Sequence, residues 1–251
     1  MASESALILF TLSPEAEGRR KSLGLGRPER AADVFAALLD HLKSVCGALQ
    51  DVDLLIATPV PAEPAGIPGR NYLPQRGRSF GESLRLAVDD AFSRGYRRVV
   101  VIGNDSPEIS RSYLENAFDA LASSGRPAAV LGPAKDGGYA LLGLTTPCPE
   151  AFEAMPWGSS RVARLTEARL VGSGFVVETL SSLEDIDDRR GLTRFLMRSR
   201  LGWLAALARR ITNLLLPEST PERSAETKRL EIFLAGWLTL RAPPGPTVAL
   251  A

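Results

Sequence analysis

The sequence predicts an α/β protein with a mostly parallel sheet and helices on both of its faces. Short apolar runs rich in strand formers alternate with segments whose apolar residues recur at helical spacing. One run, Val-Val-Val-Ile within 98–103, is unbroken, which is typical of a parallel strand covered on both faces. The 251 residues are 45% hydrophobic and 24% charged, enough to bury a full core as one large domain, or one domain plus an appendage.

The first elements follow from short local patterns. An apolar strand at 6–12 ends in a loop at 13–27 that holds glycine and basic residues. Pro28 opens an amphipathic helix, because proline is welcome in a first turn. A second apolar strand at 52–58 precedes the proline-rich segment 59–74, which we expect to be a surface loop.

The alternation continues through the middle of the chain. Ser110 is placed to cap a helix, and Asp136-Gly137 between two apolar runs is a strong hairpin signal. The remaining expected elements are a helix at 81–94, strands at 98–103, 128–132 and 139–144, a helix around 160–171 and a strand at 175–180.

Composition excludes several classes of function. Thirty basic against twenty-nine acidic side chains leave a net charge of +1, so no nucleic-acid partner is expected. Cys46 and Cys148 have no metal-like or redox-like spacing. The single histidine, His41, removes multi-histidine metal sites and disfavours Ser-His-Asp and Cys-His catalysis. With no signal sequence or transmembrane run recognised, the sequence predicts a soluble, cytoplasmic protein.

Two acidic constellations follow predicted strands. Asp105 stands directly after the strand 98–103, where a carboxylate can bind Mg²⁺ or Mn²⁺, or merely make a turn with Ser106. The segment Leu183-Glu184-Asp185-Ile186-Asp187-Asp188 follows the last strand; a solvated loop is the commoner explanation for such clustering. In an extended backbone Asp185 and Asp187 would point the same way, which favours a ligand role.

Two glycine-containing loops complete the candidate site. Lys135-Asp136-Gly137-Gly138 can be a plain turn, or can let the backbone approach a sugar or phosphate closely. Gly18-Arg19-Arg20-Lys21-Ser22 can hold a pyrophosphate, or can be an exposed basic loop without a ligand.

Taken together and in this order, these pieces resemble the bacterial DUF2064 family of glycosyltransferases, relatives of the molybdenum-cofactor and deazaflavin-cofactor nucleotidyltransferases. The resemblance covers about residues 6–192. It rests on the first strand, Gln75-Arg76-Gly77 with Phe80-Gly81-Glu82, the segments 97–107 and 132–144, Pro156-Trp157-Gly158-Ser159-Ser160, and Asp185-Ile186-Asp187.

The resemblance implies a GT-A fold, the Rossmann-like fold of nucleotide-diphospho-sugar transferases. It implies metal ligation by Asp105 and Asp187, to which the paired orientation above adds Asp185. Nucleotide phosphate contacts are implied at Gly18, Lys21 and Ser22. A sugar or acceptor side is implied at Asp136, Gly137, Gly138 and Tyr139, and Asp136 joins Asp105 and Asp187 as a catalytic candidate. Trp157 would line the acceptor pocket; its other interpretation is an indole that packs in the core or a lid.

The expected partners are a nucleotide sugar or nucleoside triphosphate, Mg²⁺ or Mn²⁺, and a small-molecule acceptor. Transfer of a sugar is the first hypothesis, and nucleotidyl transfer with release of pyrophosphate is the second. The arginine that follows the hydroxyl residue in the family loop is missing after Ser22, which counts against the second. The rewritten segment after Asp187 supports a third, a non-catalytic descendant kept for binding or assembly.

Residues 193–251 are expected to form an extension to the domain at 1–192. A basic amphipathic helix would follow Arg189, then a second helix at 222–240 and a proline-rich tail from Ala242. Such an extension can lie on an anionic membrane or mediate a homodimer, and packing on its own domain or a second subunit is favoured. Its arginines, without an acid among them, are Arg189, Arg190, Arg194, Arg198, Arg200, Arg209 and Arg210.

Overall fold

A computed structural model describes residues 3–21, 23–61, 67–122 and 127–216. The chain divides into two compact units, residues 1–211 and 212–251. The sheet, the helices that cover it and the candidate site all lie in the first unit.

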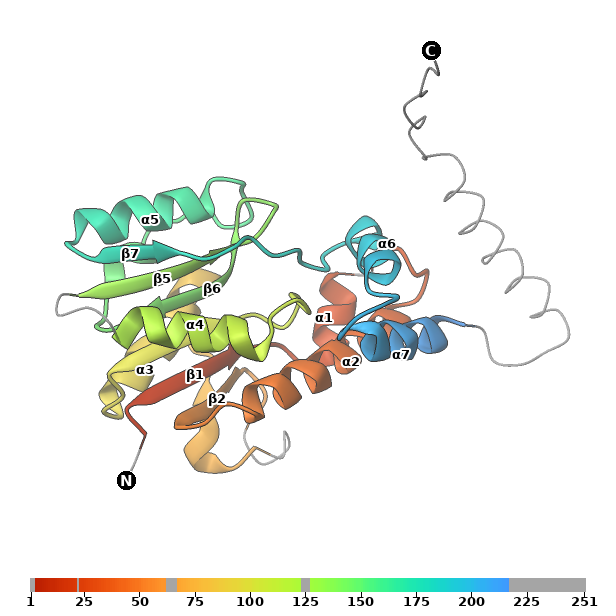
Figure 1. The fold of residues 1–251 in the computed structure, drawn as a ribbon, viewed down its shortest axis with the longest axis horizontal. Coiled ribbons are helices and arrows are strands. Elements are labelled where there is room, and N and C mark those ends of the chain that lie inside the picture. The colour runs from red at the N-terminus through yellow and green to blue at the C-terminus, as the bar shows by residue number, and fades with distance from the viewer. Residues whose placement is uncertain (1–2, 22, 62–66, 123–126, 217–251) are drawn as a thin grey trace, which may run out of the picture. The chain divides into compact units, whose positions relative to one another are not determined.

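One seven-stranded sheet forms the centre of this unit, in the order β3-β2-β1-β4-β6-β5-β7 (Figure 1). Neighbouring strands pair in parallel except at β6, which runs antiparallel to both β4 and β5. The mixed, mostly parallel α/β architecture is therefore confirmed. The strands are β1 (Ser5–Phe10), β2 (Val52–Thr58), β3 (Tyr72–Pro74), β4 (Arg98–Ile102), β5 (Ala128–Pro133), β6 (Tyr139–Leu144) and β7 (Val176–Thr179).

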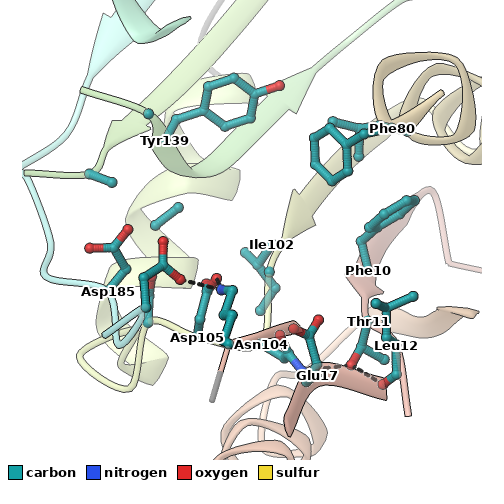
Figure 2. Close-up of a pocket in the computed structure, with 18 of the residues that line it drawn as sticks. Phe10, Thr11, Leu12, Glu17, Phe80, Ile102, Asn104, Asp105, Tyr139 and Asp185 are labelled. Carbon is teal, nitrogen blue, oxygen red and sulfur yellow. Dashed lines mark hydrogen bonds and ion pairs between the residues drawn. The ribbon is translucent and has the colours of Figure 1, made fainter. Parts of the chain in front are cut away.

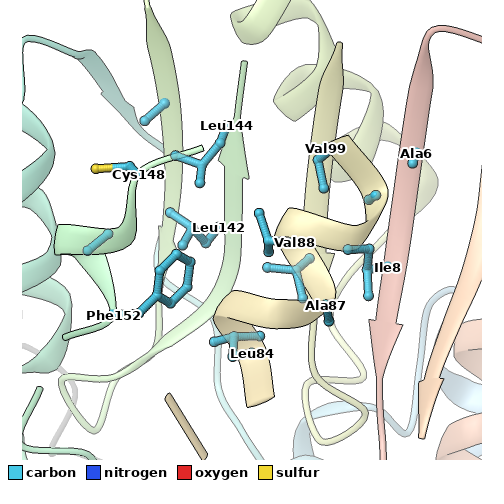
Figure 3. Close-up of a cluster of buried hydrophobic side chains, with 14 of the residues drawn as sticks. Ala6, Ile8, Leu84, Ala87, Val88, Val99, Leu142, Leu144, Cys148 and Phe152 are labelled. Carbon is cyan, nitrogen blue, oxygen red and sulfur yellow. The ribbon is translucent and has the colours of Figure 1, made fainter. Parts of the chain in front are cut away.

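Helices cover both faces because side chains alternate along the central strands. On β1, Ala6 and Ile8 join a core cluster with α3 (Phe80–Ser93) and α5 (Val162–Gly172), part of which Figure 3 shows. Leu7 and Leu9 join the opposite cluster, with α2 (Pro28–Gly47) and α4 (Arg111–Ala122). The side chains of Leu7 and Ile8 are fully buried, and burial of such a side chain contributes about 1.5–3 kcal/mol.

Two elements lie where the sequence predicted only loops. A short helix, α1 (Pro14–Arg20), begins at Ser13, whose side chain accepts a hydrogen bond from the Ala16 amide. Within the proline-rich segment, a one-turn 3₁₀ helix at Gly69–Asn71 leads into β3, which pairs with β2 at the edge of the sheet. Proline is tolerated at such an edge, where an amide donor can be spared.

The basic segment after Asp188 forms two helices rather than one. They are α6 (Arg189–Arg198) and α7 (Ala205–Leu215), separated by a bend in which Gly202 has φ of +92°. Their apolar faces are buried at Leu192, Phe195 and Ile211, so the expected boundary at 192 falls inside a packed helix. The expected helix at 222–240 and the tail lie outside the described residues. No described helix is long and apolar enough to cross a membrane.

Candidate functional site

A cavity of about 270 Å³ opens at the carboxyl ends of β1 and β4 (Figure 2). Open α/β sheets bind ligands at this edge, where loops from distant parts of the chain meet. Its walls come from the segment after β1, from α1, from the loop after β4, from the β5–β6 turn and from the acidic segment after β7. Five acidic and two basic side chains line it: Glu17, Asp105, Asp136, Asp185 and Asp187, with Arg20 and Lys21.

The Lys21 ammonium lies between two of the predicted aspartates. Its Nζ is 2.5 Å from Oδ2 of Asp105 and also forms an ion pair with Oδ1 of Asp187. Only 10% of the Lys21 side chain is exposed, so this ammonium is largely removed from water. Asp105 and Asp187, distant in sequence, therefore lie within reach of one cation, and here that cation is a lysine.

Mutual attraction controls the charge state of this pair. Burial lowers the pKa of Lys21, but Asp105 and Asp187 outweigh burial and hold it above its ordinary value. Burial likewise raises the pKa of Asp105, and the Lys21 ammonium beside it brings the pKa below the usual range. Both groups are therefore charged at neutral pH.

Three carboxylates form a second group around the same cavity. Oxygen atoms of Asp136, Asp185 and Asp187 all lie within 4.8 Å of one another. Burial first, and then the neighbouring charges of Asp136, Asp187 and Asp105, raise the pKa of Asp185 to about 6. Like charges at this spacing repel, so the group is suited to a cation.

The donor set fits the divalent ion that the resemblance implies. Mg²⁺ and Mn²⁺ prefer hard oxygen ligands, and these three aspartates offer only carboxylate oxygens. The ammonium already held between Asp105 and Asp187 is an independent sign that the cavity attracts positive charge. Of the predicted metal ligands, Asp185 and Asp187 belong to the group of three, whereas Asp105 contacts it through Lys21.

The β5–β6 turn presents Asp136 and Gly138 to the cavity. Oδ1 of Asp136 accepts a 2.7 Å hydrogen bond from the Gly138 amide, which fixes the carboxylate at the rim. Gly137 does not line the cavity: its φ is +93°, and a Cβ atom there would lie 2.3 Å from the Ser160 carbonyl oxygen. Glycine is therefore required at position 137 by the geometry of the turn and by the close packing of the 156–160 segment.

Aromatic rings form the wall opposite the acids. Tyr139 and Phe80 line the cavity, and Trp157 packs behind both, with ring centroids 6.1 and 4.8 Å away. Phe10 meets Phe80 edge to face at 5.7 Å. The Tyr139 hydroxyl is buried without a hydrogen-bond partner among the described residues. Trp157 thus supports the wall from behind and is absent from the cavity lining.

The predicted phosphate loop is only partly in the site. Lys21 lines the cavity, and Ser22 lies outside the described residues. Gly18 is buried in α1, where a Cβ atom would lie 2.6 Å from the Ala32 amide nitrogen and from the Pro28 carbonyl oxygen. Gly18 is therefore explained by the packing of α1 on the start of α2.

Sequence reasoning missed several polar residues in the cavity wall. Asn104 donates a 2.8 Å hydrogen bond to Thr11 and so ties the end of β4 to the end of β1. Gln75 donates to the carbonyl of Thr11, at 3.0 Å, and to that of Ala57, at 2.8 Å. The buried hydroxyl of Ser106 has no partner among the described residues. Asn104 and Ser106 flank Asp105 at the end of a strand. Both of them and Gln75 lie in segments that carry the resemblance, but no role in the site was predicted for any of the three.

Comparisons with known proteins show which family the chain belongs to. The profile of DUF2064, described as uncharacterized proteins conserved in bacteria, matches residues 45–159. The chain is 30% identical over 173 residues to the phosphoenolpyruvate guanylyltransferase of Sphaerobacter thermophilus, a match that covers 63% of this chain and 81% of that protein. A crystal structure from Desulfovibrio desulfuricans, assigned as a nucleotide-diphospho-sugar transferase, superposes with a TM-score of 0.73 at 26% identity, covering 85% of this chain and 97% of that one.

These similarities confirm the resemblance inferred from the sequence, and they support a transferase type of enzyme without specifying glycosyl transfer. The chain belongs to the DUF2064 family, a nucleotidyltransferase-like family of transferase enzymes.

Proposed function

We propose that this protein is a metal-dependent glycosyltransferase that moves a sugar from a nucleoside-diphosphate donor to a small hydroxyl-bearing acceptor. One observation carries the proposal: Lys21 and four aspartates from three distant loops converge on a single cavity at the carboxyl edge of the sheet. The transferase family and the similarity to a protein assigned as a nucleotide-diphospho-sugar transferase support it.

The charges around the cavity favour a diphosphate donor over a triphosphate. Both basic side chains already have acidic partners, because Arg20 contacts Glu17 at 3.0 Å and Lys21 contacts Asp105. Five acids against two bases leave the lining at a formal charge of −3. One divalent ion would offset most of this charge, and a diphosphate sugar then meets less repulsion than a triphosphate with its greater charge.

Each group in the cavity has a distinct task in the proposed transfer. The acceptor hydroxyl oxygen forms a bond to the anomeric carbon while the bond from that carbon to the diphosphate breaks, and the diphosphate leaves with the electron pair. Asp136, exposed at the rim, accepts the hydroxyl proton. Lys21 turns from its aspartates to the phosphates, and the aromatic wall of Phe80 and Tyr139 holds the acceptor.

Asp185 and Asp187 would hold the divalent ion, with Asp105 beside them, and Asp136 at the rim would stay free to accept the hydroxyl proton. When bound, the ion would neutralise the negative charge that develops on the departing diphosphate.

The proposal is tested by calorimetry and turnover with a panel of nucleotide sugars, with Mn²⁺ and with EDTA. We expect binding and transfer to need the ion. Asp105→Ala should reduce kcat by about 100-fold or more with a much smaller loss of donor affinity, because its charge acts chiefly in the transition state. Lys21→Ala should mainly raise KM, because a phosphate contact serves donor and transition state alike.

Equal turnover in EDTA, or full activity of Asp105→Ala, would refute the metal-dependent reaction. If no nucleotide binds in any condition, the protein is a non-catalytic member of its family.

Nucleotidyl transfer is the second candidate, and the relative named phosphoenolpyruvate guanylyltransferase favours it. On the same fold, an acceptor phosphate oxygen would attack the α-phosphorus of a nucleoside triphosphate and release pyrophosphate. Phosphorus NMR of the products separates the two candidates, since glycosyl transfer releases a nucleoside diphosphate. Pyrophosphate formed from GTP and phosphoenolpyruvate would replace the first candidate by the second.

A further inference from the structure

The acidic segment 183–188 is anchored through its backbone at Leu183 and Ile186. Leu183 extends the sheet locally, because its amide donates to the Pro133 carbonyl at 2.9 Å and its carbonyl accepts from the Lys135 amide at 3.0 Å. The Ile186 amide donates to the Asp105 carbonyl at 2.8 Å, and the Ile186 side chain is buried. Asp185 precedes the Ile186 anchor and Asp187 follows it, and both side chains line the cavity.

Glu184 lies at the centre of this arrangement. Its side chain is 11% exposed and contacts three cations: Lys135 Nζ at 2.9 Å, Arg198 Nη1 at 2.5 Å and Arg194 Nε at 3.3 Å. Its backbone amide donates to Oε2 of Glu108 at 3.1 Å. A carboxylate so enclosed, with its charge balanced from several sides, resists movement more than an exposed ion pair does.

The partners of Glu184 come from the loops that carry the other cavity acids. Lys135 is the neighbour of Asp136 in the β5–β6 turn, and Glu108 lies in the loop after β4, which carries Asp105. Glu184 itself adjoins Asp185. One side chain and its own amide therefore connect all three loops whose aspartates line the cavity.

Helix α6 also contacts the acidic segment 183–188 and Glu184. Asp188 begins this helix, and its Oδ1 accepts a 2.7 Å hydrogen bond from the Gly191 amide. The first turn also abuts the acidic segment, since a Cβ atom on Gly191 would lie 2.8 Å from the Asp185 carbonyl oxygen. Arg194 and Arg198 then reach back from the second and third turns to Glu184.

We propose that Glu184 is a positioning residue, and that Arg194 and Arg198 hold it, so that α6 sets the separation of the aspartates that bind the metal ion. The inference rests on the proposed function for the identity of the ion. Because Asp136, Asp185 and Asp187 repel one another, their spacing must be imposed by neighbouring groups, and the Glu184 network is the group that touches every loop concerned.

The test compares Mn²⁺ affinity, measured by electron paramagnetic resonance on the full chain, between wild type, Glu184→Gln and the double variant Arg194→Ala/Arg198→Ala. We expect Mn²⁺ to bind about 10-fold more weakly in both, a size typical of residues that orient metal ligands. In the double variant, lysine in place of alanine at position 198 (Arg194→Ala/Arg198→Lys) should restore part of the lost Mn²⁺ affinity. Arg210→Ala is the matched control, because it removes a 2.8 Å ion pair with Asp40 that does not involve the acidic segment.

The double variant separates positioning from a plain effect of charge. Removal of two cations near the site would strengthen Mn²⁺ binding if charge alone mattered, whereas loss of positioning weakens it. Hydrogen exchange gives a second readout without metal, since the Ile186 amide should exchange faster in Glu184→Gln and unchanged in the control. Unchanged or tighter Mn²⁺ binding together with unchanged exchange overturns the inference.

Failure of the proposed function gives a different result. If the wild-type chain binds no Mn²⁺, the proposed metal chemistry fails, and exchange at Ile186 alone decides whether Glu184 positions the segment. Unchanged exchange would then overturn the positioning role as well.

Discussion

The buried hydroxyl of Tyr139 is a local cost to stability. Burial raises the pKa of this phenol, and among the described residues its oxygen has no hydrogen-bond partner. An unsatisfied buried hydroxyl costs about 1–3 kcal/mol. The cost is understandable at a wall that must bind a polar ligand, because binding sites commonly exchange stability for function.

Tyr139→Phe should therefore raise the stability of the ligand-free protein by about 1 kcal/mol, because it removes an unpaired polar group. Tyr113→Phe is the matched control, since the Tyr113 hydroxyl donates to the Ser181 carbonyl at 2.8 Å and its loss should lower stability. Urea unfolding of the three proteins measures both changes. A loss of stability in Tyr139→Phe would indicate a hydrogen bond that the structure does not contain.

His41 predicts a pH dependence that one probe can follow. Burial lowers its pKa below 6.5, against a hydrogen bond with the Pro107 backbone that raises it, and the Trp203 ring lies 5.6 Å away. The unfolded chain then binds a proton more readily than the folded one. His41 therefore contributes stability that is present above about pH 6.5 and is lost as pH falls toward the folded pKa.

His41→Gln should remove this part of the pH dependence, because glutamine does not titrate. The gain in unfolding free energy on going from pH 5.5 to pH 7.5 should be smaller in the variant than in wild type. The folded pKa itself can be read from the one imidazole signal in a proton NMR titration. A folded pKa above 6.5 would contradict the argument.

At the scale of elements, glycine allows the aromatic wall to pack against α3. A Cβ atom on Gly81, in the first turn of that helix, would lie 2.3 Å from Nε1 of Trp157. Gly81→Ala should displace the indole and lower stability by about 1–3 kcal/mol, with a shift in tryptophan fluorescence. Gly47→Ala, at the end of α2 where nothing lies within 4 Å, should be neutral or stabilising. Equal stability of the two variants would show that Trp157 moves freely.

Elements with strong local signals were predictable, and those set by distant partners were not. The expected strand at 52–58 has the observed bounds of β2, and the Asp136-Gly137 signal correctly marked a hairpin. By contrast, α1 has only seven residues and no apolar stripe, and β3 forms only because β2 offers an edge. The break at Gly202 between α6 and α7 likewise depends on tertiary packing, because each of the two helices buries its own apolar face.

The site shows the same division. Asp105, Asp136, Asp185 and Asp187 were identified because strand ends in such sheets meet at one edge. Lys21 was expected at a phosphate, and no local pattern indicates that its ammonium lies between two aspartates. The role of Glu184 was equally hidden, because its partners are set by the packing of α6.

At the scale of the whole molecule, α6 and the part of α7 up to Ile211 belong to the same compact unit as the sheet. Leu192, Phe195, Leu207 and Ile211 are buried, and each such side chain contributes about 1.5–3 kcal/mol. A chain that ends at residue 188 should therefore be much less stable or insoluble, whereas a chain that ends at 216 should keep its stability and Mn²⁺ affinity. Thermal unfolding and Mn²⁺ titration of both chains check this, and a stable 1–188 chain with full Mn²⁺ affinity would contradict it.

The ion pair between Lys21 and Asp187 has a consequence for the order of events during synthesis. The two residues are 166 positions apart in the chain (187 − 21), so at about 5–20 residues per second the lysine precedes its second aspartate by about 10–30 seconds. The strands at the centre of the sheet are complete well before then. The cavity cannot close during synthesis until Asp187 has been made, so the ion pair between Lys21 and Asp187 cannot nucleate the fold that later holds it.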